Sequence, residues 1–275
     1  WGHVEVLSDV VRVIRELQPD VIIMRFPTTG EGRHGHHTAS ALLGVEAFAA
    51  AADPARFPEQ LATLSTWQPR RLYWNWFSWS APPEGEEAKQ FLQVDLGAYN
   101  PLLGRSYTEL AGESRSMHKS QGFGSAERRG TSVNYLKLIA GDPAAGVGAG
   151  SAAGAGGAEL AAAGRHELFA GIDLSWNRIP GGARVGELIE GVRRGFDPED
   201  PAASLPGLAQ VREALARLRA SGVGNTHAVL LDHKARELDD LMRSCAGLWL
   251  EAIATEHTLS PGDSLRVDVT AINRS

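Results

Sequence analysis

The chain has 275 residues, 43% hydrophobic and 22% charged, and is therefore long enough for one large or two ordinary domains with a buried core. That composition excludes disorder of the whole chain, and no uncharged apolar run approaches the roughly 20 residues of a membrane-spanning helix. A net charge of -6, from 27 basic against 33 acidic residues, argues against a nucleic-acid partner.

The first third of the chain has the pattern of an α/β layer. Apolar residues at helical spacing over residues 7–17 predict an amphipathic helix, which Pro19 ends. The apolar run Val21–Met24 predicts a strand buried on both faces, as parallel strands usually are. A polar loop containing glycine, residues 27–36, then leads into a second helix. Helix, strand, loop and helix in this order are typical of a doubly wound α/β fold.

Two further strands are predicted over Arg71–Trp79 and Phe91–Leu96, separated by a segment rich in proline. A polar helix is predicted from about Tyr107 to Gln121. From Gly141 to Gly164 the sequence consists almost entirely of glycine and alanine, which predicts a flexible surface insertion. Residues 1–140 are therefore expected to form a Rossmann-like parallel sheet with flanking helices.

The rest of the chain is predicted to be helical, followed by a strand. Two apolar stripes at helical spacing predict an antiparallel helix pair. The first comprises Leu208, Val211, Leu215 and Leu218, and the second Leu238, Leu241, Met242, Cys245, Leu248, Trp249 and Ala252. Residues 265–271 alternate apolar and polar side chains, which predicts a strand that opens a truncated β-sandwich. The expected segments are thus an α/β domain (1–140), a Gly/Ala-rich insertion (141–165), a helical region (166–256) and a β segment (257–275).

The segment from Thr28 to Ser40 places three of the nine histidines, His34, His36 and His37, within four positions. It connects the carboxyl end of a predicted strand to a helix, which is where ligands bind in open α/β sheets. If the helix has begun by His34, His34 and His37 share one face. A helix N-terminus disfavours imidazolium, and neutral imidazole is the form that coordinates a metal. Histidines also cap helices or face water, but three in four positions favour a site.

These residues resemble a known family. Gln18–Ile23, followed by Gly32 and by His34–His37 at the start of a helix, looks like the second metal box of the LmbE-like, or PIG-L, zinc-dependent deacetylases. That family usually shows P-D-V-V, a short loop and G-H-P-D-H. The segment His118–Gln121, after a strand that ends at Asp95, is similar to the family's H-x-S-Q segment. The resemblance covers about residues 1–125.

The resemblance implies a Rossmann-like fold and hydrolysis of an N-acetyl group, typically on an amino sugar, by a zinc-activated water. By position, His37 is implied to be a metal ligand. His34 is implied to steady the developing oxyanion or to donate a proton to the leaving amine. Four further residues are candidates for contacts around the metal or the substrate, namely Arg33, His36, Asp95 and His118.

Two departures from the family pattern matter. Gly35 and His36 replace the usual Pro-Asp between the histidines, and the family's first box, A-H-P-D-D, is absent. A hydrolytic zinc site needs about three protein ligands and a water. The chain begins with Trp1 rather than Met, which suggests a piece of a longer protein. We therefore expect the remaining Zn²⁺ ligands and the general base in a preceding segment, so that these 275 residues alone bind zinc poorly and turn nothing over.

Weaker signals have both structural and functional interpretations. Trp67, Trp74, Trp76 and Trp79 fall close together and could form a wall that stacks on sugars, but strand alternation favours burial on both faces. Asp95 ends a strand, where its carboxylate could orient a histidine or cap the following turn.

Other functions compete with the deacetylase. The chain lacks a G-x-S-x-G turn and a phosphate-binding G-x-x-x-x-G-K-[ST] loop, which argues against a serine hydrolase and a nucleotide-binding protein. The main alternative is a non-catalytic α/β module that binds carbohydrate, and a third is a metal-dependent hydrolase of another amide or ester. A β-sandwich start after the helices resembles domains of exported carbohydrate-active enzymes, which favours an extracytoplasmic location.

Overall fold

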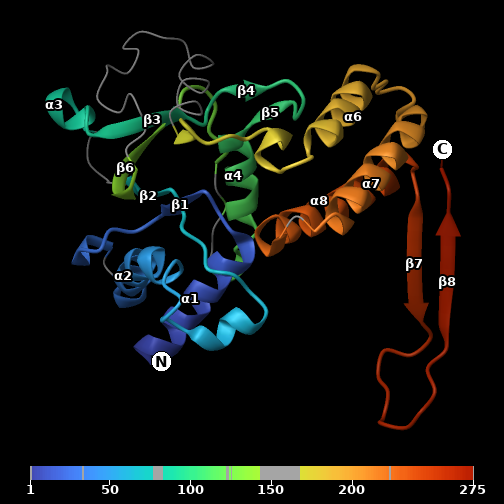
Figure 1. Ribbon diagram of the computed structural model, residues 1–275, viewed down its shortest axis with the longest axis horizontal. Coiled ribbons are helices and arrows are strands. Elements are labelled where there is room, and N and C mark those ends of the chain that lie inside the picture. The colour runs from blue at the N-terminus through green and yellow to red at the C-terminus, as the bar shows by residue number, and fades with distance from the viewer. Residues whose placement is uncertain are drawn as a thin grey trace. The chain divides into compact units, whose positions relative to one another are not determined.

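The computed structural model describes residues 2–32, 34–76, 83–121, 124, 126–142, 168–222 and 224–274. The chain divides into two compact units, residues 1–172 and 173–275. The first unit mixes helices and strands (Figure 1). Its longer elements are α1 (His3–Leu17), β1 (Val21–Met24), α2 (Gly35–Ala50), β2 (Arg71–Trp76), α3 (Gly85–Ala88), β3 (Phe91–Asp95), β4 (Tyr99–Asn100), β5 (Arg105–Ser106), α4 (Tyr107–Ser116) and β6 (Val133–Gly141).

A mixed four-stranded sheet in the order β1-β2-β6-β3 forms the centre of the first unit. β1 and β2 are parallel, with Val21 opposite Arg71 and Met24 opposite Trp74. β6 runs antiparallel to both β2 and β3. The predicted α/β class is therefore confirmed, whereas the prediction of a wholly parallel sheet is wrong. The reason is that β6, which the sequence pattern did not predict, enters between β2 and β3 in the opposite direction.

Three predicted features fall wholly or partly outside the described residues. Residues 77–79 of the strand expected over Arg71–Trp79 lie there, and so does Arg33 of the histidine segment. From residue 143 onward, the Gly/Ala-rich segment also lies outside the described residues. The chain is described again from residue 168, so only the two flanks of that segment enter the structural account.

α1 and α2 pack together beside the first two strands. Leu7, Val11 and Ile14 of α1 are buried against alanines of α2, as the helical spacing predicted. α1 ends at Leu17, and the next residue, Gln18, adopts a left-handed conformation before Pro19. α2 approaches β1 closely at Gly44, where an added Cβ would lie 3.0 Å from the sulfur of Met24. This packing fixes the start of α2 near the carboxyl end of β1.

Arg15 of α1 is fully buried, with 0% of its surface exposed. Its guanidinium donates to six oxygen atoms of the segment that leaves α2. These are the carbonyls of Ala50 (3.3 Å), Ala51 (3.1 Å), Asp53 (2.9 Å), Arg56 (2.9 Å) and Phe57 (3.1 Å) and Oε1 of Gln60 (3.2 Å). Burial lowers the pKa of Arg15, and the carboxylates of Glu59 and Asp53 partly oppose that shift. Arg15 thus adds a further donor to the carbonyls at and after the end of α2, four of which also accept a backbone amide.

Arg71, the first residue of β2, also donates to several backbone carbonyls. It is 2% exposed and donates to the carbonyls of Asp142 and Leu168, each at 3.0 Å, and to that of Ala170. Asp142 and Leu168 flank the Gly/Ala-rich segment. The two flanks are therefore held at one guanidinium.

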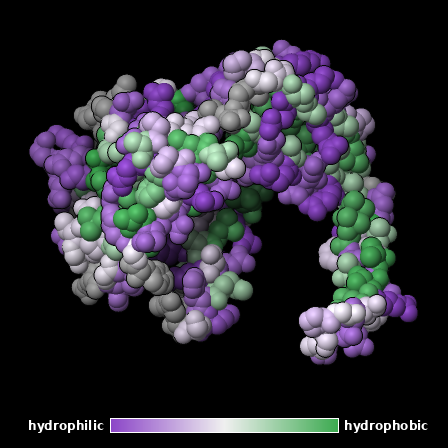
Figure 2. Space-filling view, turned by 60° about the horizontal axis from the view of Figure 1, so that its bottom comes forward, coloured by the Kyte–Doolittle hydropathy of each residue, from purple (hydrophilic) through white to green (hydrophobic). Residues whose placement is uncertain are grey.

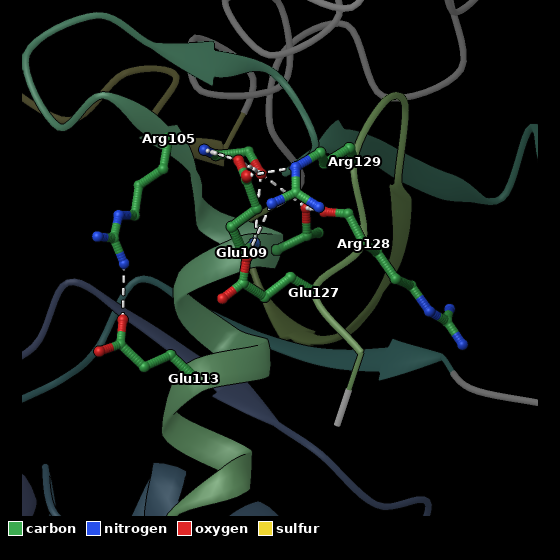
Figure 3. A network of polar contacts seen from close by, with 8 residues as sticks. Arg105, Glu109, Glu113, Glu127, Arg128 and Arg129 are labelled. Atoms are coloured by element: carbon green, nitrogen blue, oxygen red, sulfur yellow. Dashed lines mark hydrogen bonds and ion pairs between the residues drawn. The ribbon is translucent and has the colours of Figure 1, made fainter. Parts of the chain in front are cut away.

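The start of α4 is held by a network of polar contacts (Figure 3). Ser106 and Glu109 form a capping box, in which the Ser106 amide donates to Oε2 of Glu109 at 2.8 Å and the Glu109 amide donates to Oγ of Ser106 at 3.3 Å. Arg129 contacts Oε1 of Glu109 at 2.8 Å and also pairs with Glu127. The network ties α4 to residues 127–129, which precede β6.

Glu109 makes the stability of this network depend on pH. The hydrogen bonds from Ser106, together with Arg129, hold the pKa of Glu109 below its ordinary value of 4.5. A carboxylate with a lowered folded-state pKa stabilises the fold above its unfolded pKa, and that stabilisation is lost as pH falls through the folded pKa. We expect Glu109→Gln to lower the thermal midpoint at pH 7 and to flatten its decline below about pH 4.5. Thermal denaturation between pH 3 and pH 7 measures both effects.

Glu113→Gln is the matched control, because Glu113 lies on the same helix and its carboxylate pairs with the exposed Arg105 at 2.7 Å. Exposed pairs contribute little to stability, so this exchange should leave the thermal midpoint nearly unchanged. Equal effects of the two substitutions would contradict the role assigned to the capping box.

The second unit contains three longer helices and a hairpin. Its elements are α6 (Ala183–Arg194), α7 (Leu205–Ala220), α8 (Gly224–Cys245), β7 (Trp249–Ala254) and β8 (Val267–Ile272). The predicted α7 stripe is confirmed, since all four of its members are buried in one cluster. Arg219 pairs with Asp232 and Arg212 with Asp239, an order that makes α7 and α8 antiparallel, as predicted. Among the described residues, none of the helices combines the length and apolar character needed to span a bilayer.

The predicted end of the second apolar stripe is wrong. α8 ends at Cys245, Leu241 is 49% exposed, and Trp249 and Ala252 belong to β7 rather than to a helix. β7 pairs antiparallel with β8, so the predicted C-terminal strand has a partner within the chain. Every residue of both strands is exposed, and Figure 2 shows hydrophobic residues along this β7–β8 hairpin. The pairing places six apolar side chains on one face, namely Leu250, Ala252, Ala254, Val267, Val269 and Ala271.

Candidate functional site

The histidine segment lies at the carboxyl end of β1, where α2 begins. The chain leaves β1 after Met24, forms a short 3-10 turn at Gly30–Gly32 and enters α2 at Gly35. His34 is the residue before the helix and has an extended backbone, with φ -119° and ψ 133°. The helix has therefore not begun by His34, which was the condition for His34 and His37 to share a helix face; only His36 and His37 lie within the helix.

The three imidazole rings are nevertheless gathered together. The ring centroids of His34 and His37 lie 5.1 Å apart, those of His36 and His37 4.3 Å, and those of His34 and His36 5.6 Å. Backbone hydrogen bonds create this proximity, since the His34 carbonyl accepts from the amides of His37 and Thr38 at 3.0 and 3.3 Å. His34 and His36 are exposed and His37 is half-buried. Ligands in solution can therefore reach the cluster.

Sequence reasoning missed one neighbour of the cluster. The ring of Phe26 stacks on that of His37, with centroids 3.7 Å apart and planes 7° from parallel. Phe26 follows β1 by two residues and packs against the apolar cluster between α2 and the sheet. The only sequence signal is an aromatic residue directly after a predicted strand, which is too common to indicate a role.

The donor set suits a transition metal but is short of a complete site. Imidazole is a good ligand for Zn²⁺, and the ring centroids of His34 and His37 lie 5.1 Å apart. Hydrolytic zinc sites use about three protein ligands. Within the described ranges, no group of three His, Cys, Asp or Glu side chains is placed to hold a metal ion.

The other predicted site residues have structural surroundings. Asp95 is 3% exposed, and its Oδ1 accepts from the amides of Gly97 and Ser132, both at 2.8 Å. Of its two predicted roles, the cap is therefore observed, and no histidine of the described residues hydrogen-bonds to its carboxylate. His118 is exposed and lies just after α4, where its amide donates to the carbonyl of Arg115. The ring contacts of the cluster join His34, His36 and His37 to one another and His37 to Phe26.

The tryptophans of β2 and its approach are partly buried, as strand alternation favoured. Trp67 donates through Nε1 to the carbonyl of Pro19 at 2.8 Å, and Trp74 packs into the cluster beneath α2. Trp76 makes edge-to-face contacts with Phe91 and Tyr135, with centroids 6.3 and 6.0 Å apart. These contacts make Trp67, Trp74 and Trp76 part of the packing of the first unit.

Comparison of the chain with family models, with curated protein sequences and with solved structures finds no match. A function for the chain therefore depends on the chemistry of the histidine cluster and on its position at the sheet.

Proposed function

We propose that this chain carries part of the active site of a zinc-dependent hydrolase that removes an N-acetyl group from an amino sugar or a related small molecule. The observation that supports this proposal is the gathering of three imidazole rings within 5.6 Å at the carboxyl end of β1. In the proposal, the α/β unit is a Rossmann-like fold whose ligands bind at that edge of the sheet.

His37 and His34 have different surroundings that fit different tasks. His37 lies on α2, is half-buried and stacks on Phe26, so it is held as a metal ligand must be. His34 precedes the helix and is exposed, so it can contact a substrate beside the metal. In the proposed reaction, His34 steadies the oxyanion or gives a proton to the leaving amine. When bound, zinc supplies an activated water whose pKa is about 7.

The described residues leave the metal shell and the general base incomplete, and the proposal assigns both to a strand outside these 275 residues. β1 is an edge strand of the described sheet, and Ile23 in its middle is 49% exposed. An apolar strand with one unpaired edge can pair with a further parallel strand. The carboxyl end of a strand at that edge would lie beside the histidine cluster. A His and an Asp there would complete the zinc shell, and a second Asp would act as the base.

The test measures metal content, zinc affinity and release of acetate from N-acetylated amino sugars. It compares the 275-residue chain with a polypeptide that adds the preceding segment of its natural chain. We expect weak zinc binding and no turnover from the 275 residues, and tight binding with turnover from the longer polypeptide. An active 275-residue chain would refute the assignment of the base to another segment. If the longer polypeptide binds sugar but does not bind zinc and does not release acetate, the chain is a carbohydrate-binding module.

A further inference from the structure

We infer that Phe26 is a positioning residue that holds the imidazole of His37 in the orientation in which it accepts a metal ion. The inference concerns the site of the proposed function and rests on it. The two rings are nearly parallel, with planes 7° apart and centroids separated by 3.7 Å. Such close face-to-face contact covers one face of the imidazole and restrains the rotation of its ring.

The core of the α/β unit holds Phe26. Its ring packs against a cluster formed by buried residues of β1, α2 and β2, namely Met24, Ala41, Phe48 and Leu72. Met24 and Leu72 are 8% and 0% exposed, so the support beneath Phe26 belongs to the closely packed interior. Phe26 therefore has little freedom to move, and the ring that stacks on it is restrained as well.

The backbone of His37 is fixed independently of its ring. Its amide donates to the carbonyl of His34 at 3.0 Å, and its carbonyl accepts from Oγ of Ser40 at 2.8 Å. With the backbone fixed in the first turn of α2, the remaining freedom of His37 is that of its side-chain torsions. Stacking on Phe26 removes much of that freedom before any ligand arrives.

Restraint before binding has a predictable effect on affinity. A side chain that is ordered only on binding loses rotamer freedom at that moment, and pre-organisation avoids this cost. From the usual strength of an aromatic pair, loss of the stack should weaken metal binding by about 2-fold to about 10-fold. This is a smaller effect than loss of a ligand, and that size distinguishes a positioning residue from one that touches the metal.

The experiment uses the 275-residue chain with Phe26→Leu, Phe26→Tyr and, as a matched control, Phe48→Leu. Phe48 belongs to the same apolar cluster but lies in the last turn of α2, away from the histidines at its start. The first readout is the proton NMR spectrum without metal, in which the ring current of Phe26 shifts the ring protons of His37 upfield. The second is titration with ZnCl₂ followed by calorimetry.

We expect Phe26→Leu to abolish the upfield shift and to weaken zinc binding by about 2-fold to about 10-fold. Phe26→Tyr should retain both properties, and Phe48→Leu should lose stability while keeping both. An unchanged shift in Phe26→Leu, or equal losses of zinc affinity in Phe26→Leu and Phe48→Leu, would overturn the inference. If the parent chain and its longer form show the shift but bind no zinc, the ring restraint stands and the zinc-dependent function fails.

Discussion

Replacing Arg15 with methionine is expected to lower the free energy of unfolding of the α/β unit by about 3–5 kcal/mol. Methionine preserves the apolar stem of the side chain but supplies no donor to the six oxygen atoms that Arg15 contacts. Four of the five carbonyls also accept a backbone amide, so the expected loss is that of the charge-assisted hydrogen bonds from a fully buried guanidinium. Arg15→Lys should recover only part of the loss, because an ammonium group has three donors and no planar fork.

Urea denaturation combined with hydrogen exchange of the α1 and α2 amides measures this effect within the α/β unit. Arg12→Met is the matched control, since Arg12 lies on the same helix and is exposed. The control should change the free energy of unfolding by less than about 0.5 kcal/mol. A loss below about 1 kcal/mol for Arg15→Met would mean that water replaces the guanidinium and that the buried contacts are not required.

Replacing His37 with alanine is expected to weaken zinc binding by at least about 100-fold in the longer polypeptide that completes the proposed site. Loss of residues that merely orient a metal ligand costs about 10-fold to 100-fold, and loss of a ligand should cost no less. Acetate release should fall with zinc occupancy. Calorimetric titration with ZnCl₂ and an acetate assay measure the two effects separately.

The two neighbouring histidines provide controls for this prediction. His36→Ala removes an exposed imidazole from the same turn of α2 and should leave zinc affinity nearly unchanged. His34→Ala should reduce turnover at saturating zinc while zinc remains bound, because its assigned task is with the substrate. If His36→Ala abolishes binding and His37→Ala does not, the metal ligand of this segment is His36.

Local patterns predicted the elements that frame the histidine cluster. Helical spacing located α1 and its buried face, and the apolar run Val21–Met24 located β1. The same spacing located α7 in the second unit. Prediction succeeded here because one element, with its polar and apolar faces, carries all the information within ten to twenty residues.

Prediction failed where pairing partners lie far apart in the chain. Residues 133–141 were not predicted as a strand, because the alternation of apolar and polar residues changes phase between Tyr135 and Leu136. The antiparallel direction of β6 follows from where the chain re-enters the sheet, between β2 and β3. In the second unit, Trp249 continued the helical spacing of α8 but pairs with Ile272 in a hairpin.

The features of the candidate site also fall into those that local sequence predicted and those that it did not. The cluster of three histidines after a strand was visible in the residues, whereas the position of His34 outside the helix and the stack of Phe26 on His37 were not. Asp95 was assigned two roles from sequence, and its hydrogen bonds to the amides of Gly97 and Ser132 selected the cap.

The sequence by itself determined the α/β class, the places of α1, β1, α2 and α7, and the presence of an imidazole-rich segment after β1. These features depend on periodicity and composition, which are properties of neighbouring residues. Only the tertiary structure decided the mixed direction of the sheet, the burial of Arg15 among carbonyls and the packing of Phe26 on His37. Each of these depends on which distant segments meet, and the free energy of packing selects that arrangement for the chain as a whole.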